Sequence, residues 1–388
     1  MITRIVADNF KSFKHFDIKL DKFNVFIGPN ASGKSNFLSL LQFISDFQNM
    51  GFENAVSIQG GGAYLKYLNA EEKNIRIQIY YNNRIHIPII SRKTQKITNI
   101  SSIDNLYEID IEYSGNRIKN YSEKLTLKGL LKDRGKYIPI EITNKKHKIN
   151  FDILGKQEYE AIPTILMNNF VFKDKSIADS IGRIGIYDFD PGLSRKAIPI
   201  NAKYDFESDG SNLTLILKNI MENKNEKKEL ISIISSILNY IKDIQIENLS
   251  DKSIMFKNKE EFGDNKFIIP SSFMSSGTAN IYSIIIAIFF SKNNIIAIEE
   301  PEKGMHINLI SRIIELMIEA SNKKQIIITT HNSEILRFSP KNSLFLISRD
   351  NYGSSKIVKP IETKEIRMFL NDEMGIDMSV LLEDGFLN

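Results

Sequence analysis

Eight consecutive residues constrain the fold of this chain more than any other feature. Residues 28–35 read Gly-Pro-Asn-Ala-Ser-Gly-Lys-Ser and match the pattern G-x-x-x-x-G-K-[ST] in full. The apolar run from Phe23 to Ile27 precedes them, and the spacing of apolar residues from Asn36 to Phe47 predicts a helix after them. A strand, a glycine-containing loop and a helix in this order form the context in which the pattern binds phosphate.

Each position of this loop has a physical role in binding a nucleoside triphosphate. Gly28 and Gly33 allow the backbone to curl, so that successive N–H groups point toward the phosphates. Lys34 would reach the β- and γ-phosphates, and the Ser35 hydroxyl would bind Mg²⁺, which makes ATP and Mg²⁺ the predicted ligands. The nucleotide-binding residues predicted here are Gly28, Asn30, Ala31, Ser32, Gly33, Lys34 and Ser35.

Two later segments supply polar groups to the same site. The apolar strand predicted from Ile295 to Ile298 ends in Glu299 and Glu300, and its tip would deliver both carboxylates beside the phosphate loop. We expect Glu299 to hold Mg²⁺ and Glu300 to orient and deprotonate the attacking water. His331 follows the next apolar strand and is predicted to sense the γ-phosphate.

The segment from Phe273 to Asn280 reads Phe-Met-Ser-Ser-Gly-Thr-Ala-Asn and precedes a predicted helix. Ser275, Ser276 and Gly277 place small hydroxyls and a glycine at a helix N-terminus, which is a surface suited to an anion. Taken alone, such a segment is equally typical of a helix cap.

The pattern along the chain indicates an α/β protein with an inserted segment. Residues 1–160 and 270–388 together form the predicted nucleotide-binding domain, with an antiparallel β subdomain at about residues 60–155. Residues 161–269 are predicted to be an inserted, mainly helical lobe, with helices from Asn212 to Met221 and from Lys227 to Ile241. The sequence has no extended apolar heptads, so a long coiled coil is not expected.

Composition excludes some classes of site and partner. The 388 residues contain no cysteine, which excludes disulfides and thiolate metal sites. The longest apolar run, Ile281 to Phe290, is half of the roughly 20 residues that a membrane-spanning helix needs. No signal peptide opens the sequence, and we therefore expect a cytoplasmic protein without a membrane partner. The net charge of +4 permits contact with nucleic acid but does not argue strongly for it.

The chain resembles the ABC-type ATPase heads of the SMC, Rad50 and RecF group. It presents, in the same order, the phosphate loop, the segment from Phe273 to Asn280 (called the signature segment below), the pair Glu299 and Glu300, and His331. Within this group, the chain is most similar to the compact AAA-type ATPases of prokaryotic anti-phage defence systems. Residues 9–13 (Asn-Phe-Lys-Ser-Phe), 187–191 (Tyr-Asp-Phe-Asp-Pro) and 209–213 (Asp-Gly-Ser-Asn-Leu) resemble motifs of that set. Asp209 and Ser211 also suit the cap of a helix that begins there.

The resemblance implies that two copies dock around two ATP molecules. Ser275 and Gly277 of one copy would contact the γ-phosphate held by the other, and residues 302–306 would form the loop that crosses the interface. The glutamine that senses Mg²⁺ in such heads is not placed by the sequence, although Gln59 and Gln78 are candidates.

Two functions remain open at this point. The first is an ATP-driven regulatory switch for an effector such as a nuclease or toxin, since fewer than sixty residues follow His331 and none of the usual nuclease motifs is evident. The alternative is a RecF-like, ATP-dependent DNA-binding clamp in DNA repair. Its basic stretches would be residues 92–93, 132–136 and 145–148. A transporter ATPase would need membrane-domain partners and ranks last.

Overall fold

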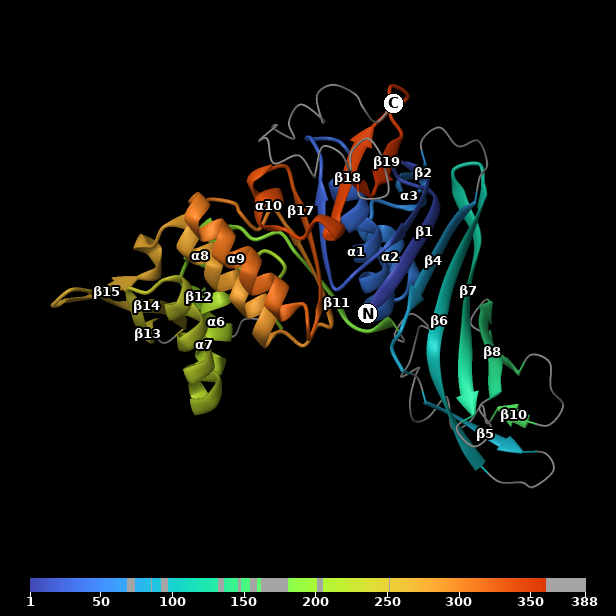
Figure 1. Cartoon of the computed structure of the whole chain (residues 1–388), viewed down its shortest axis with the longest axis horizontal. Coiled ribbons are helices and arrows are strands. Elements are labelled where there is room, and N and C mark those ends of the chain that lie inside the picture. The colour runs from blue at the N-terminus through green and yellow to red at the C-terminus, as the bar shows by residue number, and fades with distance from the viewer. Residues whose placement is uncertain are drawn as a thin grey trace.

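Parallel strands from distant parts of the chain form the central sheet of the computed structural model (Figure 1). In spatial order the strands are β11 (Ile184–Tyr187), β16 (Ile295–Glu299), β17 (Gln325–Thr330), β3 (Phe23–Ile27), β18 (Leu344–Arg349) and β19 (Ser355–Val358). The first five are parallel, and β19 is antiparallel to β18. Carboxyl ends of parallel strands meet at one edge of a sheet, which brings the segments after β3, β16 and β17 together.

The structure describes residues 1–67, 74–84, 86–91, 97–131, 136–145, 148–153, 159–161, 181–200, 205–250 and 252–360. Within these ranges the longest helix, α1 (Lys34–Met50), has 17 residues, so the described part contains no coiled-coil arm. None of the described helices is both long and apolar enough to pass through a bilayer.

A nine-stranded antiparallel sheet forms a second layer, which extends to the lower right in Figure 1. Its main path runs through β2 (Phe13–Lys19), β1 (Ile2–Phe10), β4 (Ile75–Tyr81), β6 (Ile97–Ser114), β7 (Arg117–Leu131), β8 (Lys136–Lys145) and β9 (Lys148–Ile153). The short strands β5 (His86–Ser91) and β10 (Tyr159–Ala161) pair beside this path. Alternate side chains of β4 are buried, as expected for a sheet with one covered face.

Helix α1 fills the space between the two sheets, together with α2 (Phe52–Ile58) and α3 (Gly62–Leu65). Phe37 of α1 stacks on Phe26 of β3 at 4.2 Å, and Phe26 stacks on Phe345 of β18 at 4.6 Å between ring centroids. The same buried cluster includes Ile77 and Ile109 of the antiparallel sheet. This core fixes the start of α1, and with it the phosphate loop.

The opposite face of the central sheet is covered by a second buried cluster. It includes residues of α6 (Leu213–Glu222), α7 (Lys224–Ile237), α8 (Ser276–Ile285), α9 (Ile307–Ala320) and α10 (Glu334–Phe338). Helix α8 continues into a π-helical turn, η3 (Ile286–Phe290), so the apolar run near residue 285 is a buried helix. A mixed α/β core with an added antiparallel layer is the fold that the sequence predicts.

The described part of segment 161–269 differs from the mainly helical lobe that we expected. Its strand β11 belongs to the central sheet, and β12 (Ile198–Pro199), β13 (Ile241–Ser250), β14 (Ser253–Phe262) and β15 (Asn265–Pro270) form a separate four-stranded sheet. The helix expected to reach Ile241 ends at Ile237, and Ile241 begins β13. Side chains along β14 alternate in burial, which is a period-two pattern that a helix could not satisfy.

Candidate nucleotide-binding site

The phosphate loop leaves β3 at Gly28 and enters α1 at Lys34. Ala31 has φ 64° and Gly33 has φ 118°, so left-handed residues alternate with ordinary ones along the loop. Such alternation turns backbone N–H groups toward one concave side, where an anion can bind. Asn30 and Ala31 are exposed there, and the buried Ser32 hydroxyl has no hydrogen-bond partner among the described residues. The loop geometry therefore suits the role predicted for it.

Two glycines of the loop are required by close contacts as well as by conformation. A Cβ on Gly28 would lie 2.2 Å from the Ile347 carbonyl oxygen, and one on Gly33 would lie 2.3 Å from Ser355 Oγ. Both distances are far below van der Waals contact. Residues of β18 and β19 thus pack directly against the loop at Gly28 and Gly33.

Lys34 lies folded against its own loop. Its ammonium group donates to the carbonyl oxygens of Gly28 at 2.8 Å and of Pro29 at 2.9 Å. Burial lowers the pKa of Lys34, and the nearby carboxylates Glu300, Glu299 and Glu302 oppose that shift. These hydrogen bonds are ones that a bound phosphate would replace with stronger, charge-assisted ones.

Ser35 and Glu299 are brought together across the site, although 264 residues separate them in sequence. Ser35 Oγ donates to Glu299 Oε1 at 2.7 Å. Two oxygens at this distance fit neighbouring positions around Mg²⁺, since ligands at about 2.1 Å in octahedral geometry lie roughly 3 Å apart. The described residues contain no cluster of three or more His, Asp or Glu side chains that could hold a metal. Mg²⁺ suits such a sparse site because it usually keeps water and phosphate as its other ligands.

Glu300 and His331 form a pair at the neighbouring strand ends. His331 Nδ1 lies 2.5 Å from Glu300 Oε1. Glu300 has φ 46°, an uncommon value for a non-glycine residue, and its N–H donates to the Thr329 carbonyl at 2.8 Å. A carboxylate only accepts hydrogen bonds, so in this contact Nδ1 of the ring would be the donor to Glu300. The carboxylate therefore orients the imidazole.

The predicted signature segment lies apart from these groups. Ser275 is the N-cap of α8, where its hydroxyl accepts from the Thr278 N–H at 3.1 Å, and Ser275 itself is exposed. Gly277 packs against the loop after β16, because a Cβ there would lie 2.6 Å from the Gly304 carbonyl oxygen. Figure 1 shows α8 in the left lobe and α1 to the right of β17. Within the described chain no hydrogen bond joins Ser275, Ser276 or Gly277 to the phosphate loop.

The motif at residues 9–13 supports the phosphate loop through hydrogen bonds of Ser12, a role that the sequence did not indicate. Asn36 donates to Ser12 Oγ at 2.7 Å, the hydroxyls of Ser12 and Ser355 lie 2.8 Å apart, and Ser355 Oγ donates to the Ser32 carbonyl at 2.7 Å. Because each hydroxyl has one hydrogen, Ser12 must donate to Ser355. The buried chain runs from α1 through the β1–β2 turn and β19 to the loop.

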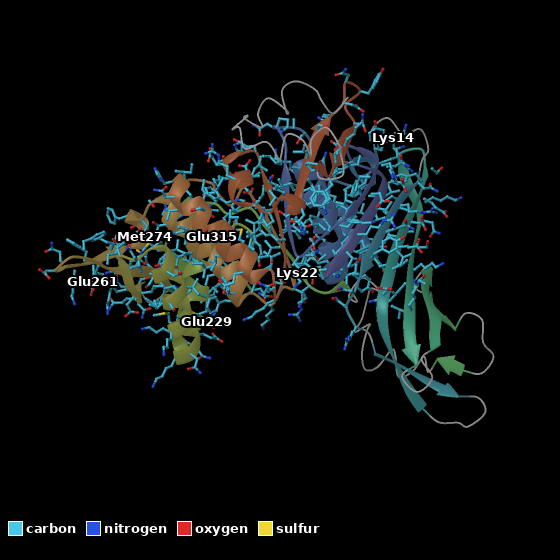
Figure 2. All side chains as sticks on the ribbon, viewed as in Figure 1. Lys14, Lys22, Glu229, Glu261, Met274 and Glu315 are labelled. Carbon is cyan, nitrogen blue, oxygen red and sulfur yellow. The ribbon has the colours of Figure 1, made fainter. Side chains whose placement is uncertain are left out.

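The motif at residues 187–191 supports the signature segment. Asp190 caps α5 (Pro191–Ser194) by accepting from the Gly192 N–H at 2.7 Å. Arg195, immediately after α5, donates to the Met274 carbonyl at 2.6 Å. Figure 2 labels Met274 beside the four-stranded sheet, one residue before the N-cap of α8. The sequence singled out this motif without indicating its role.

The expectation that residues 209–212 cap a helix with their side chains is wrong in detail. Helix α6 begins at Leu213, and Asn212 at its N-cap makes no capping hydrogen bond with its side chain. Instead the Asn212 amide donates to the carbonyl of Asp205 at 2.8 Å, and Asp209 accepts from the Ser211 N–H at 2.9 Å. These side chains fold the loop back on itself.

Neither candidate for the Mg²⁺-sensing glutamine reaches the site. Gln78 lies on β4 and donates to Glu108 of β6 at 2.7 Å, on the antiparallel sheet. Gln59 ends α2, and its N–H bonds within that helix. No hydrogen bond joins Gln59 or Gln78 to the phosphate loop in the described structure.

Substitution of Gly33 by alanine is expected to weaken ATP binding by about 10-fold or more. A side chain at φ 118° is strained, and its Cβ would collide with Ser355 Oγ. Relief of a strain of roughly 1–2 kcal/mol would move the N–H groups out of their phosphate-binding arrangement. Titration with a fluorescent ATP analogue measures the effect. Gly51→Ala is the matched control, since Gly51 has φ 83° and open space around it; equal affinity losses in both variants would contradict the prediction.

Comparison with known proteins agrees with this geometry. The sequence family described as "AAA domain, putative AbiEii toxin, Type IV TA system" matches residues 23–337. An ATP/GTP phosphatase of Helicobacter pylori is 22% identical over 376 residues, which cover 90% of this chain and 93% of that protein. The crystal structure of an SMC head bound to the C-winged helix domain of ScpA has a TM-score of 0.55 at 16% identity, and the match covers 92% of this chain and 97% of that one. This likeness shows a shared fold.

Two further relatives match over part of their length. The DNA replication and repair protein RecF of Clostridium kluyveri is 25% identical over 190 residues, covering 46% of this chain and 47% of RecF. Endonuclease GajA of Bacillus cereus is 29% identical over 191 residues, covering 42% of this chain and 28% of GajA. The chain thus spans about half or less of these two proteins. Because the family match covers most of the chain, including the phosphate loop, the carboxylate pair and His331, the chain belongs to this family of AAA-type ATPases, with the fold of an SMC head.

Proposed function

We propose that this protein binds and hydrolyses ATP as a homodimer and acts as a regulatory switch for an effector partner. One observation carries the proposal. The phosphate loop, Glu299, Glu300 and His331 meet at one edge of the central sheet, whereas the signature segment ends in an exposed N-cap elsewhere on the same chain. A second copy is what would bring a signature segment to the phosphates.

The proposed chemistry divides among residues of the chain. Loop N–H groups and Lys34 hold the phosphates, and Glu300 accepts a proton from the attacking water. His331, oriented by Glu300, would release its hydrogen bond to meet the γ-phosphate. Ser35 and Glu299 would hold Mg²⁺, which when bound offsets the negative charge of the phosphates.

ATP would then join the two copies, since each nucleotide lies between a phosphate loop and the partner's Ser275 and Gly277. Loss of the γ-phosphate removes that bridge, so ATP favours a closed dimer and ADP an open one. A switch needs two states of different structure, so that another protein binds one state better than the other.

An effector in anti-phage defence fits the family. The family's description includes a toxin of a type IV toxin–antitoxin system, and one relative is an endonuclease. We therefore propose a nuclease or toxin as the partner. Co-purification of the tagged protein with the product of an adjacent gene would test this partner, and recovery of the tagged protein alone under ATP-saturated conditions would count against it.

The alternative, a DNA-binding clamp, is favoured by the similarity to RecF. Most of its predicted basic stretches, at residues 92–93, 132–136 and 145–148, lie outside the described residues or have undescribed side chains. An ATP-dependent mobility shift of duplex DNA that weakens steeply with salt would favour the clamp. Absence of a shift at low salt would dispose of it.

The proposal predicts that the specific ATPase activity rises with protein concentration and then saturates. Isolated copies lack a complete site, so activity should follow the fraction of dimer, measured in parallel by analytical ultracentrifugation with ATP. Lys34→Ala, which removes the charged phosphate ligand, should show little activity at any concentration. A specific activity independent of concentration in a protein shown to be monomeric would contradict the composite site.

A further inference from the structure

The loop that follows β16 is held by the signature helix. Asn280 of α8 is buried and donates from Nδ2 to two backbone carbonyls, those of Pro301 and Lys303, each at 3.0 Å. Both of its amide hydrogens are thereby used. The close approach of Gly277 to Gly304 adds a second contact between α8 and this loop. A shift of α8 would therefore carry residues 301–304 with it.

The side chain of Glu302, which lies between these two carbonyls in the sequence, reaches the end of the neighbouring strand β17. Glu302 is 8% exposed, and its Oε1 accepts a hydrogen bond from the Thr330 hydroxyl, while its Oε2 has no partner among the described residues. Burial raises the pKa of Glu302, and the hydrogen bond from Thr330 opposes that shift. Burying a carboxyl with so few partners costs free energy of folding.

Thr330 connects this carboxyl to the catalytic groups. Its Oγ also accepts from the Asn332 N–H at 2.9 Å, which fixes the backbone on both sides of His331. Its carbonyl accepts from the Gly28 N–H at 3.3 Å, at the first residue of the phosphate loop. Thr330 thus contacts Glu302, the backbone that flanks His331, and the phosphate loop.

We propose that Glu302 and Thr330 are positioning residues. They couple helix α8, which carries the signature segment, to Glu300 and His331 of the same chain. Asn280 holds the backbone on either side of Glu302, and Thr330 holds its side chain. Docking of a partner's nucleotide on Ser275 and Gly277 would displace α8 slightly. Asn280, Glu302 and Thr330, which we call the relay, would pass that displacement to Glu300 and His331. Hydrolysis in one site would thus respond to occupancy of the other.

This inference rests on the proposed ATP-dependent dimer and names how that dimer is regulated. It predicts a loss of turnover rather than of ATP affinity, because neither Glu302 nor Thr330 contributes its side chain to the phosphate-binding loop. Misplacement of catalytic groups by a fraction of an ångström to one ångström lowers rates by on the order of 10- to 100-fold.

Thr330→Val tests the relay, since valine keeps the shape of threonine and removes the hydroxyl. We expect kcat to fall by about 10- to 100-fold, with the dissociation constant for ATP close to that of the wild type. Thr330→Ser retains the hydroxyl and should keep most of the turnover. Thr214→Val is the matched control, because Thr214 on α6 is equally buried and its hydroxyl has no hydrogen-bond partner in the described structure.

Asn280→Ala approaches the same relay from the signature helix and keeps the test valid if Thr330→Val does not fold. If both residues act through Glu302, the double variant should be little slower than the slower single variant. Independent effects that multiply in the double variant would overturn the proposal. So would equal losses in Thr330→Ser and Thr330→Val, or a parallel loss of ATP affinity and kcat.

Failure of this inference is distinguishable from failure of the proposed function. A wild-type protein without ATP turnover at any concentration would refute the proposed function. A wild-type protein that turns over ATP as a dimer, alongside a Thr330→Val variant of unchanged kcat and thermal stability, would refute the relay alone.

Discussion

Glu300→Gln is expected to lower the ATP turnover number by about 10²- to 10⁴-fold, the usual contribution of a general base. Glutamine cannot take a proton from water at neutral pH. Its amide oxygen can still accept the hydrogen bond that joins residue 300 to His331, so the local geometry should persist. Removal of one negative charge near Lys34 and the phosphates should also favour bound ATP.

The same variant should therefore accumulate as an ATP-bound dimer. Sedimentation with ATP, together with turnover measured by phosphate release, separates the two effects. Glu334→Gln is a suitable charge control. Glu334 lies three residues after His331 in the sequence, and it pairs with the exposed Arg337 rather than with His331. A Glu300→Gln protein that remained monomeric under conditions where the wild type dimerises would contradict the composite site.

The parts of the site that sequence could predict are contiguous in the chain. Residues 28–35 would hold phosphate largely through their own backbone, so eight neighbouring positions are enough to predict this role. Glu299 and Glu300 were placed because they end an apolar run, and parallel strands end at the same edge of a sheet. The pairing of Ser35 with Glu299 follows from those two facts.

Other contacts depend on residues that nothing in the local sequence connects. Ser12 and Ser355 are 343 residues apart, and nothing in the sequence around either serine indicates that the two side chains meet. Glu302 reads as one more acid after a carboxylate pair, and its burial against Thr330 appears only when β16 and β17 are adjacent. Arg195 likewise reaches Met274 across 79 residues. Such contacts need the tertiary fold.

The four-stranded sheet in residues 198–270 was missed for a different reason. Residues 227–241 contain enough apolar residues at helical spacing to predict one continuous helix. The period changes at Leu238, where the helix ends, and β13 then buries Ile241 and Ile244. Short apolar runs fit both periods, and pairing with β14 decides between them.

Ser275→Asp is expected to abolish ATP-driven dimerisation and, with it, turnover. Aspartate is as good an N-cap as serine, so α8 should keep its start. Its carboxylate would face the partner's γ-phosphate, and two such charges at 4 Å repel by roughly 4 kcal/mol in a partly buried setting. That repulsion corresponds to an approximately 10³-fold weaker association at each site.

Two neighbouring substitutions isolate the charge at the signature segment. Ser275→Asn caps the helix equally well without a charge, and its loss of association should be much smaller. Ser272→Asp adds the same charge at an exposed position three residues earlier and should leave dimerisation nearly unchanged. Equal losses for Ser275→Asn and Ser275→Asp would mean that no phosphate faces this position.

An equimolar mixture of Ser275→Asp and Lys34→Ala chains gives the decisive form of the test. Each chain alone has two defective sites in its homodimer. In the heterodimer, the intact phosphate loop of the Ser275→Asp chain meets the intact signature segment of the Lys34→Ala chain, which restores one complete site. ATP-dependent association should therefore reappear on mixing, whereas turnover at the restored site should stay below the wild-type value, because the second site is doubly defective and cannot act on α8 of the Ser275→Asp chain. If two folded variants failed to associate with ATP when mixed, the phosphate loop and the signature segment would not act across an interface.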